Sequence, residues 1–199
     1  EWKGTEQFPI RGFHHCRFYV GNAKQAVHFY RTAFGFDPMA YSGPETGNKK
    51  EVCYVLKQNH VYFELVTPLN STHPGAEWLK RHGDGVFDIA IDVADPFEAH
   101  ASCLSRGAES AYAPTEVKDA SGAIRRAGIK TYGDTIHSLV DSSQYKGIWA
   151  PGYVELTLPK VHTPAAGLMA IDHIVGNVEL GKMDYWAKWY ERVLGLYNF

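Results

Sequence analysis

Apolar and polar positions along the first third of the chain predict a strand, a helix and three further strands. The helix is indicated by apolar residues at helical spacing between Asn22, which can cap it, and Gly35, which ends it. The last two strands form a hairpin with Gln58-Asn59 at its tip. We expect these strands over residues 13–20, 39–42, 51–57 and 60–67. The order of elements is therefore βαβββ.

The same order of elements returns in the middle of the chain. Asp95-Pro96 supplies a helix cap and a first-turn proline, and Gly107 stops that helix. A short helix around residues 76–82 lies between the two groups of elements. We expect the second set of strands over residues 86–93, 109–117, 124–132 and 135–140. The predicted fold class is α+β, with paired βαβββ modules over residues 13–67 and 86–141.

The opening of this module occurs once more at the end of the chain. Phe18-Tyr19-Val20-Gly21-Asn22 leads to a helix that ends at Gly35, and His173-Ile174-Val175-Gly176-Asn177 leads to a helix that ends at Gly195. A single strand and helix cannot bury their apolar faces alone. We therefore expect the tail to be mobile, to exchange into a neighbouring chain or to dock on the preceding domain. The expected organisation is a domain over residues 10–153, a linker over 154–167 and the start of a second domain over 168–199.

Composition describes an ordinary globular chain. Hydrophobic residues make up 45% and charged residues 21%, with a net charge of -2, so nothing favours nucleic-acid or membrane-surface binding. No run approaches the roughly 18 apolar residues of a membrane span. Cys16, Cys53 and Cys103 are odd in number and far apart, which indicates reduced thiols in a cytoplasmic protein.

Five short motifs occur in one order from Phe13 to the end of the chain. They lie at residues 20–26 (VGNAKQA), 82–86 (HGDGV), 132–135 (YGDT), 151–153 (PGY) and 171–177 (IDHIVGN). In this register the chain resembles the N-terminal half of the 4-hydroxyphenylpyruvate dioxygenases, a family of the vicinal oxygen chelate superfamily. Several motifs in sequence make a more specific signal than any one of them.

The resemblance implies an Fe(II)-dependent oxidoreductase of tyrosine and phenylalanine catabolism. Members of the family convert 4-hydroxyphenylpyruvate and O2 to homogentisate and CO2, with iron held by two histidines and a glutamate in their C-terminal domain. By this resemblance His173 is the first iron ligand, and the other two ligands are expected beyond Phe199. No catalytic residue is then predicted within the chain, which is expected to be inactive by itself. The resemblance also implies a homodimer or homotetramer.

Three further polar residues mark a possible second metal site. His15 is interpreted as the counterpart of His173, and Asp88 and His137 fall near the places of the other two ligands in the family's second domain. Either they bind a metal in the first domain, or duplication left them in a barrel that now serves as support. We favour the second interpretation, because ligand-type residues without supporting contacts are weak evidence of a site.

Two other functions remain open. Hydroxymandelate synthase uses the same substrate and ligand set but hydroxylates the benzylic carbon. A domain of this fold can also bind a small molecule without chemistry, as bleomycin-resistance proteins do. The partial third module from Leu168 onward argues against such a stand-alone binder.

Overall fold

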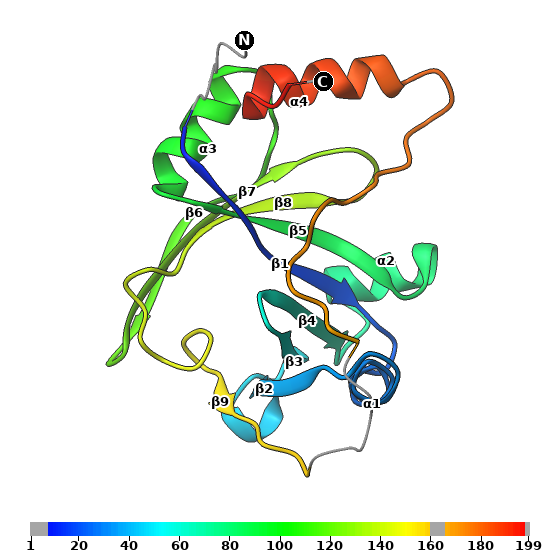
Figure 1. Ribbon diagram of the computed structural model, residues 1–199, viewed down its shortest axis with the longest axis vertical. Helices are drawn as coiled ribbons and strands as arrows, with labels where there is room; N and C mark the ends of the chain where they lie inside the picture. The colour runs from blue at the N-terminus through cyan, green and yellow to red at the C-terminus, as the bar shows by residue number, and fades with distance from the viewer. Residues whose placement is uncertain (1–7, 160–165, 198–199) are drawn as a thin grey trace.

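One mixed sheet of nine strands organises residues 8–159 and 166–197, which are the residues that this computed structural model describes (Figure 1). The strands lie side by side in the order β6-β7-β8-β5-β1-β4-β3-β2-β9. They are β1 (Ile10–Tyr19), β2 (Asp37–Ser42), β3 (Glu51–Gln58), β4 (Val61–Pro68), β5 (Gly85–Val93), β6 (Ser110–Asp119), β7 (Gly122–Lys130), β8 (Ile136–Asp141) and β9 (Val154–Glu155). The helices are α1 (Ala23–Phe34), α2 (Pro74–His82), α3 (Pro96–Ser105) and α4 (Met183–Leu194), with a 3-10 turn η1 at Pro44–Thr46.

The two predicted βαβββ modules form the two halves of this sheet. In each module the first strand pairs in parallel with the last, β1 with β4 and β5 with β8, and the modules join through the antiparallel pair β1–β5. This confirms the α+β fold of paired modules. The hairpin tip lies one residue later than predicted, because Asn59 takes the left-handed conformation (φ 52°) and the turn is Asn59-His60.

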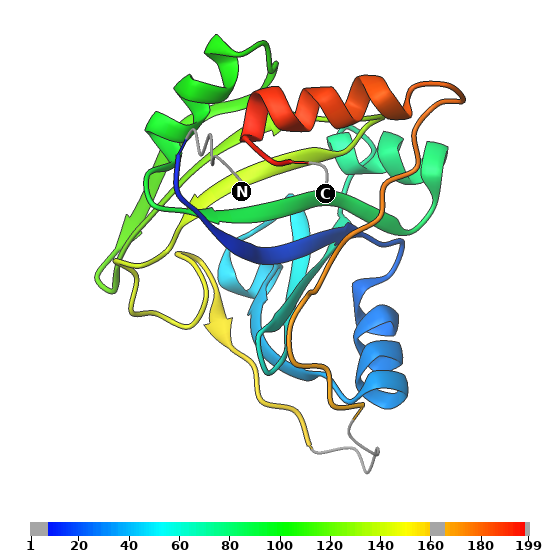
Figure 2. The ribbon, with the colours of Figure 1, turned by 45° about the horizontal axis from the view of Figure 1, so that its top comes forward.

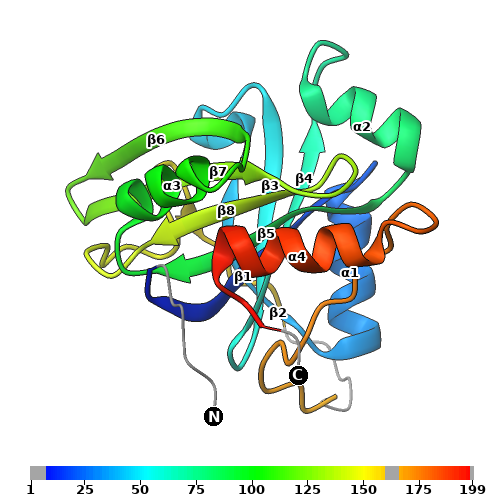
Figure 3. The same ribbon diagram turned by 90° about the horizontal axis from the view of Figure 1, so that it is seen from above.

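Helices cover the outer face of each half. The inner side of α1 places Ala23 and Val27 against Phe36, Leu56 and neighbouring residues of the first module. In the second module α3 and α4 lie next to each other over β7 and β8 (Figures 1 and 3). All three cysteines are buried free thiols, which confirms the expectation of reduced cysteines.

The tail departs from prediction in one respect and follows it in another. The strand predicted between Leu168 and the Gly176-Asn177 turn does not form, because among the described residues no neighbouring strand accepts its backbone hydrogen bonds. The helix that follows does form and packs on the second module, so docking is the outcome seen for α4 (Figure 2). The segment expected as linker also contributes β9, which pairs with β2 at the sheet edge. In the described part of the chain, no helix is long and apolar enough to cross a membrane.

Candidate functional site

A cavity of about 800 Å³ lies on the inner face of the sheet, between the two modules. Side chains from β1, β4, β6, β7 and β8 line it, and residues 149–153 run along its rim. The lining includes Arg17, Glu64, Tyr112, Trp149 and Tyr153. We call this cavity the chamber. It is large enough for a small organic molecule, and its walls combine aromatic rings with charged groups.

A cluster of paired charges forms the floor of the chamber. The Arg17 Nε donates a 3.0 Å hydrogen bond to Glu64 Oε2, and the Arg17 Nη1 lies 3.9 Å from Asp88 Oδ2. His15 Nε2 is 3.5 Å from the same Glu64 oxygen, and the Tyr153 hydroxyl donates to the other one. Glu64 and Asp88 are both buried. Buried charges persist when each has a partner, and here one guanidinium serves two carboxylates.

Arg17, Glu64 and Tyr153 each keep one protonation state near neutral pH. Burial alone would raise the pKa of Glu64, but the Arg17 charge and the hydrogen bonds from His15 and Tyr153 hold it well below its usual range. Burial would lower the pKa of Arg17, and the two carboxylates hold it well above its usual value. Burial and the Glu64 charge raise the pKa of the Tyr153 phenol. These three groups are therefore poor proton carriers at neutral pH.

Asp88 is held by the strand beside it. The Ser138 backbone N–H donates to Asp88 Oδ1 at 2.9 Å, and the Ser138 hydroxyl donates to Oδ2. The Tyr112 hydroxyl donates to Ser138 Oγ at 2.7 Å. Gly128 makes room for this ring, since a Cβ there would lie 2.2 Å from Tyr112 Cε1. The chain of donors leaves Asp88 satisfied and turned toward the protein.

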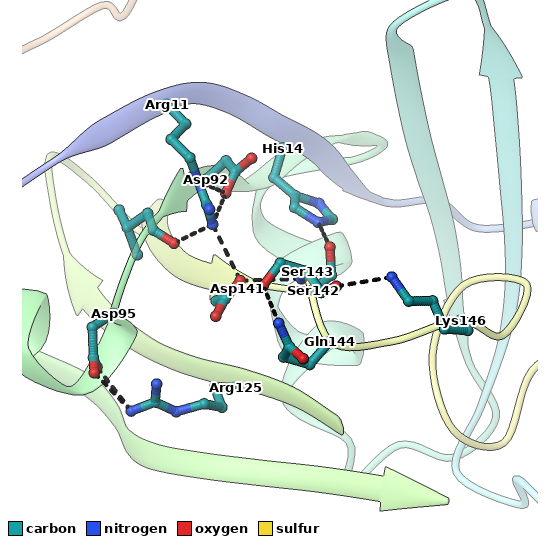
Figure 4. A network of polar contacts seen from close by, with 11 residues as sticks. Arg11, His14, Asp92, Asp95, Arg125, Asp141, Ser142, Ser143, Gln144 and Lys146 are labelled. Atoms are coloured by element: carbon teal, nitrogen blue, oxygen red, sulfur yellow. Dashed lines mark hydrogen bonds and ion pairs between the residues drawn. The ribbon is translucent and has the colours of Figure 1, made fainter. Parts of the chain in front are cut away.

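A second polar network ties β1 to the strands of the other module beside the chamber (Figure 4). Arg11 bridges Asp92 and Asp141, at 2.9 Å and 3.1 Å, and His14 Nε2 lies 3.0 Å from the Ser142 hydroxyl. His14 Nδ1 lies 2.7 Å from His15 Nδ1. Burial, and then the neighbouring His15, lower the pKa of His14 to about 3. His14 is therefore neutral at physiological pH, and its two ring nitrogens link His15 to Ser142 by hydrogen bonds.

None of the three cysteines lines the chamber, and none is suited to act as a nucleophile. Burial raises the pKa of Cys16 to about 12 and that of Cys103 to about 11. Burial likewise raises the pKa of Cys53, which lies beneath the chamber. A buried thiol that stays protonated is a weak nucleophile and a weak metal ligand.

Comparison with known proteins assigns the fold to a family. The model of the glyoxalase/bleomycin resistance protein/dioxygenase superfamily matches residues 12–134. The chain belongs to this superfamily. Among curated relatives it resembles the 4-hydroxyphenylpyruvate dioxygenase of Yarrowia lipolytica, with 38% identity over 197 residues, which is 95% of this chain and 50% of that protein. The enzyme of the same name from Danio rerio is 40% identical over 205 residues, or 96% of this chain and 50% of the relative.

Solved structures share this fold. A mutant of 4-hydroxymandelate synthase from Streptomyces coelicolor matches 96% of this chain and 54% of its own, with a TM-score of 0.80 and 26% identity. Methylmalonyl-CoA epimerase in complex with methylmalonyl-CoA and NH4+ matches 72% of this chain and 100% of its own, at a TM-score of 0.56 and 21% identity, and shares the fold alone. The chain spans about half the length of the curated relatives that it matches.

Within this superfamily fold, the three residues considered as a possible second metal site do not come together. His15 lines the chamber, and Asp88 is buried behind Arg17 on the same face of the sheet. His137 lies on the other face of the sheet, where Nδ1 bonds to the Ile89 carbonyl and Nε2 to the Tyr190 hydroxyl of α4. His137 points away from the other two because successive residues of a strand point to opposite faces, and Ser138 takes the inward position. Across residues 8–159 and 166–197, no group of three or more His, Cys, Asp or Glu is arranged to hold a metal ion.

Arg17 and Glu64 are the site residues that the sequence analysis missed. They are direct neighbours in the parallel β1–β4 register, so both side chains point into the chamber. Glu64 stands inside an otherwise apolar stretch, VYFELV, and this was a usable signal. A charged residue in a strand that is otherwise apolar needs a partner, and the partner is found only once the strand order is known.

His173 is the residue for which the sequence predicts a role as an iron ligand. Its side chain is exposed, and Nδ1 lies 2.7 Å from Asp172 Oδ2. One imidazole does not make a complete iron site, which in a facial triad takes two histidines and a carboxylate. The contact with Asp172 does leave Nε2 turned away from that carboxylate.

Proposed function

We propose that this chain forms the N-terminal half of a 4-hydroxyphenylpyruvate dioxygenase. The enzyme would convert 4-hydroxyphenylpyruvate and O2 to homogentisate and CO2, in the cytoplasm, as a step of tyrosine breakdown. One observation carries the proposal: the identity of 38–40% to enzymes of that name covers about 95% of the chain and includes the segment around His173. The superfamily fold alone would not select this reaction, because one fold supports many activities.

In this proposal His173 is one ligand of Fe(II), and the remaining ligands come from sequence outside this chain. The hydrogen bond of Nδ1 with Asp172 supports the role, since metal-bound histidines usually donate their second ring N–H to a carboxylate or carbonyl. That contact fixes the tautomer and leaves Nε2 as the atom that would bind the metal. The substrate would then bind at the iron site, in the half of the enzyme that supplies the remaining ligands.

The chamber has a supporting role in this scheme. Its two buried carboxylates are paired with Arg17, and neither offers a free oxygen pair in the geometry that a divalent ion needs. The cluster therefore stabilises the β1–β4–β5 centre of the sheet. In this proposal the reaction takes place in the other half of the enzyme, which completes the iron site.

The test uses the full-length protein that contains this sequence. Loaded with Fe(II) and given 4-hydroxyphenylpyruvate, it should consume O2 and release homogentisate. His173→Ala should lose iron binding and turnover together, because a facial triad does not retain iron after losing a ligand. His28→Ala, an exposed histidine on α1, is the matched control and should keep both. Full activity in His173→Ala would overturn the proposal.

A second candidate reaction is the formation of 4-hydroxymandelate. The match to a 4-hydroxymandelate synthase structure, with a TM-score of 0.80 over 96% of the chain, favours keeping it. Both reactions start from the same substrate, so product analysis separates them. Chromatography of the reaction mixture should give homogentisate, and 4-hydroxymandelate in its place would select the second reaction.

A third candidate is binding without chemistry, which the chamber makes physically possible. Under this alternative the full-length protein would neither bind Fe(II) through His173 nor consume O2. We further propose that the intact enzyme is a homodimer or homotetramer, which light scattering at several protein concentrations would establish.

A further inference from the structure

Two helices of the same repeat bury different residues. Both α1 and α4 are twelve residues long and end at a glycine with φ 74°, Gly35 and Gly195, so they align position by position. In α1, Phe29 is 54% and Phe34 39% exposed. Their counterparts in α4, Trp189 and Leu194, are 4% and 2% exposed.

The exchange is reciprocal. Ala23 of α1 is buried against its own sheet, and its counterpart Met183 in α4 is 73% exposed. Phe36 is likewise buried, and its counterpart Leu196 is exposed. Each helix therefore has an inner side, suited to the sheet of its own module, and a second apolar side, which we call the outer side. In α1 the outer side is Phe29, Ala33 and Phe34.

The structure shows what an outer side of this kind binds. In α4 it packs on the second module, against Ala99 and Cys103 of α3 and against sheet residues of β5, β7 and β8. The end of α4 is held there by Arg106, whose Nε and Nη2 donate to the Val193 carbonyl at 3.2 Å and 2.9 Å. Arg192 returns a hydrogen bond to the Arg106 carbonyl at 2.9 Å. A helix from the third module thus docks on the second module, alongside α3 and over its sheet.

We propose that the outer side of α1 is the docking surface for an α3-type helix from the second domain of the full-length protein. This inference rests on the proposed function, in which a second pair of βαβββ modules completes the chain. If the two domains are related by a two-fold axis, contact of module three with module two requires contact of module one with module four, since such interfaces are reciprocal. Exposed aromatic residues grouped on one helix are typical of a surface that is covered in the assembly.

The symmetry also defines the chemistry of the occupant. Its helix should present small residues at the positions that correspond to Ala99 and Cys103, because Phe29 and Phe34 supply the bulk of the contact. It should carry an arginine or lysine beyond its last turn, where Arg106 stands in α3. That cation would donate to the Ala33 carbonyl as Arg106 does to Val193, which is favourable at the negative end of a helix.

Hydroxyl-radical footprinting of the full-length protein tests the proposal without using activity. Phe13 is 39% exposed in this chain, as Phe34 is, and Phe36 is buried. Phe13 and Phe36 therefore serve as the exposed and the buried internal reference. In the full-length protein Phe29 and Phe34 should be labelled as slowly as Phe36 and more slowly than Phe13. Labelling of Phe34 at the rate of Phe13 would overturn the proposal. Protection that disappears on dilution would also overturn it, because the occupant would then be a second copy.

A pair of variants sharpens the result. Phe29→Lys should lower the melting temperature of the full-length protein and speed amide exchange in α1. His28→Lys places the same charge on the neighbouring exposed position and should change neither. Equal effects of the two substitutions would contradict docking. Since neither readout depends on the product formed, a failure of the dioxygenase proposal remains distinguishable from a failure of this one.

Discussion

The first and last copies of the repeated segment begin from similar sequence and reach different structures. In the first copy, β1 has a parallel neighbour on one side and an antiparallel neighbour on the other. In the last copy, residues 171–177 are not a strand, although the helix that follows is complete. A helix satisfies its own backbone hydrogen bonds and needs only an apolar surface, whereas a strand depends on neighbours for every one of them. The copies therefore differ in the element that cannot form alone.

The largest effect is expected where the first copy carries its buried charges. Arg17→Met would leave Glu64 and Asp88 without their cation, and breaking a buried ion pair in this way costs about 3–5 kcal/mol of unfolding free energy. Urea titration measures the loss. Arg126→Met, an exposed arginine on the chamber wall, is the control and should stay within about 0.5 kcal/mol of the parent. Similar losses in the two variants would contradict the role given to Arg17.

The packing of α4 on the second module should depend mainly on the Trp189 side chain. Trp189 is buried among residues of α3 and the sheet, so Trp189→Ala should cost about 3 kcal/mol and release α4. Hydrogen exchange would show α4 amides exchanging faster while those of β1 stay protected. Met183→Ala removes an exposed side chain from the same helix and should have little effect. Unchanged protection of α4 in Trp189→Ala would show that another contact holds it.

A fall in pH should lower the unfolding free energy of the protein through His14, which lies in the first copy. Its folded pKa is lowered to about 3, whereas an unfolded histidine takes up its proton near about 6.5. Between these values the unfolded state binds more protons, so stability decreases as the pH falls, by up to about 1.4 kcal/mol per pH unit. Unfolding free energies from about pH 6.5 to about pH 4.5 should show this slope, and His14→Gln should flatten it. The Glu64 contribution has a lower window, because its depressed pKa matters only below about 4.3.

The smallest effect is expected at the polar contact between the last copy and the second module. Tyr190 Oη lies 2.8 Å from both Thr131 Oγ1 and His137 Nε2. Tyr190→Phe removes the hydroxyl and keeps the ring, so we expect a loss of about 1 kcal/mol. Thermal unfolding of Tyr190→Phe, of His137→Gln and of the double variant would measure the coupling free energy between the two side chains. Strictly additive losses would mean that the two side chains act independently.

Local pattern was sufficient for most of the fold. The strand-to-helix order of both modules, the Asn22 cap and the Gly35 stop were predicted, and each is found in the structure. Short-range signals report these features because caps and turns depend on neighbouring residues. The strand β9 was missed, since its two residues are held only by pairing with β2, a contact made across more than half of the chain.

The candidate site was harder to predict than the fold. Histidine is a common metal ligand, so the sequence suggested a role for His137 at the site. In the structure His137 points away from the chamber and contacts Tyr190 of α4. Arg17 and Glu64 drew none, although they form the centre of the buried charge cluster. Side-chain direction in a strand changes at every residue, so an error of one position moves a residue to the other face.

The sequence alone determined the duplicated modules, the family resemblance and the helices with their caps, because each of these depends on residues close together along the chain. Only the tertiary structure decided which charged residues share the chamber, which face His137 occupies and where α4 docks. These outcomes depend on strand order and on contacts between distant segments. The free energy of such contacts exists only after the modules have assembled.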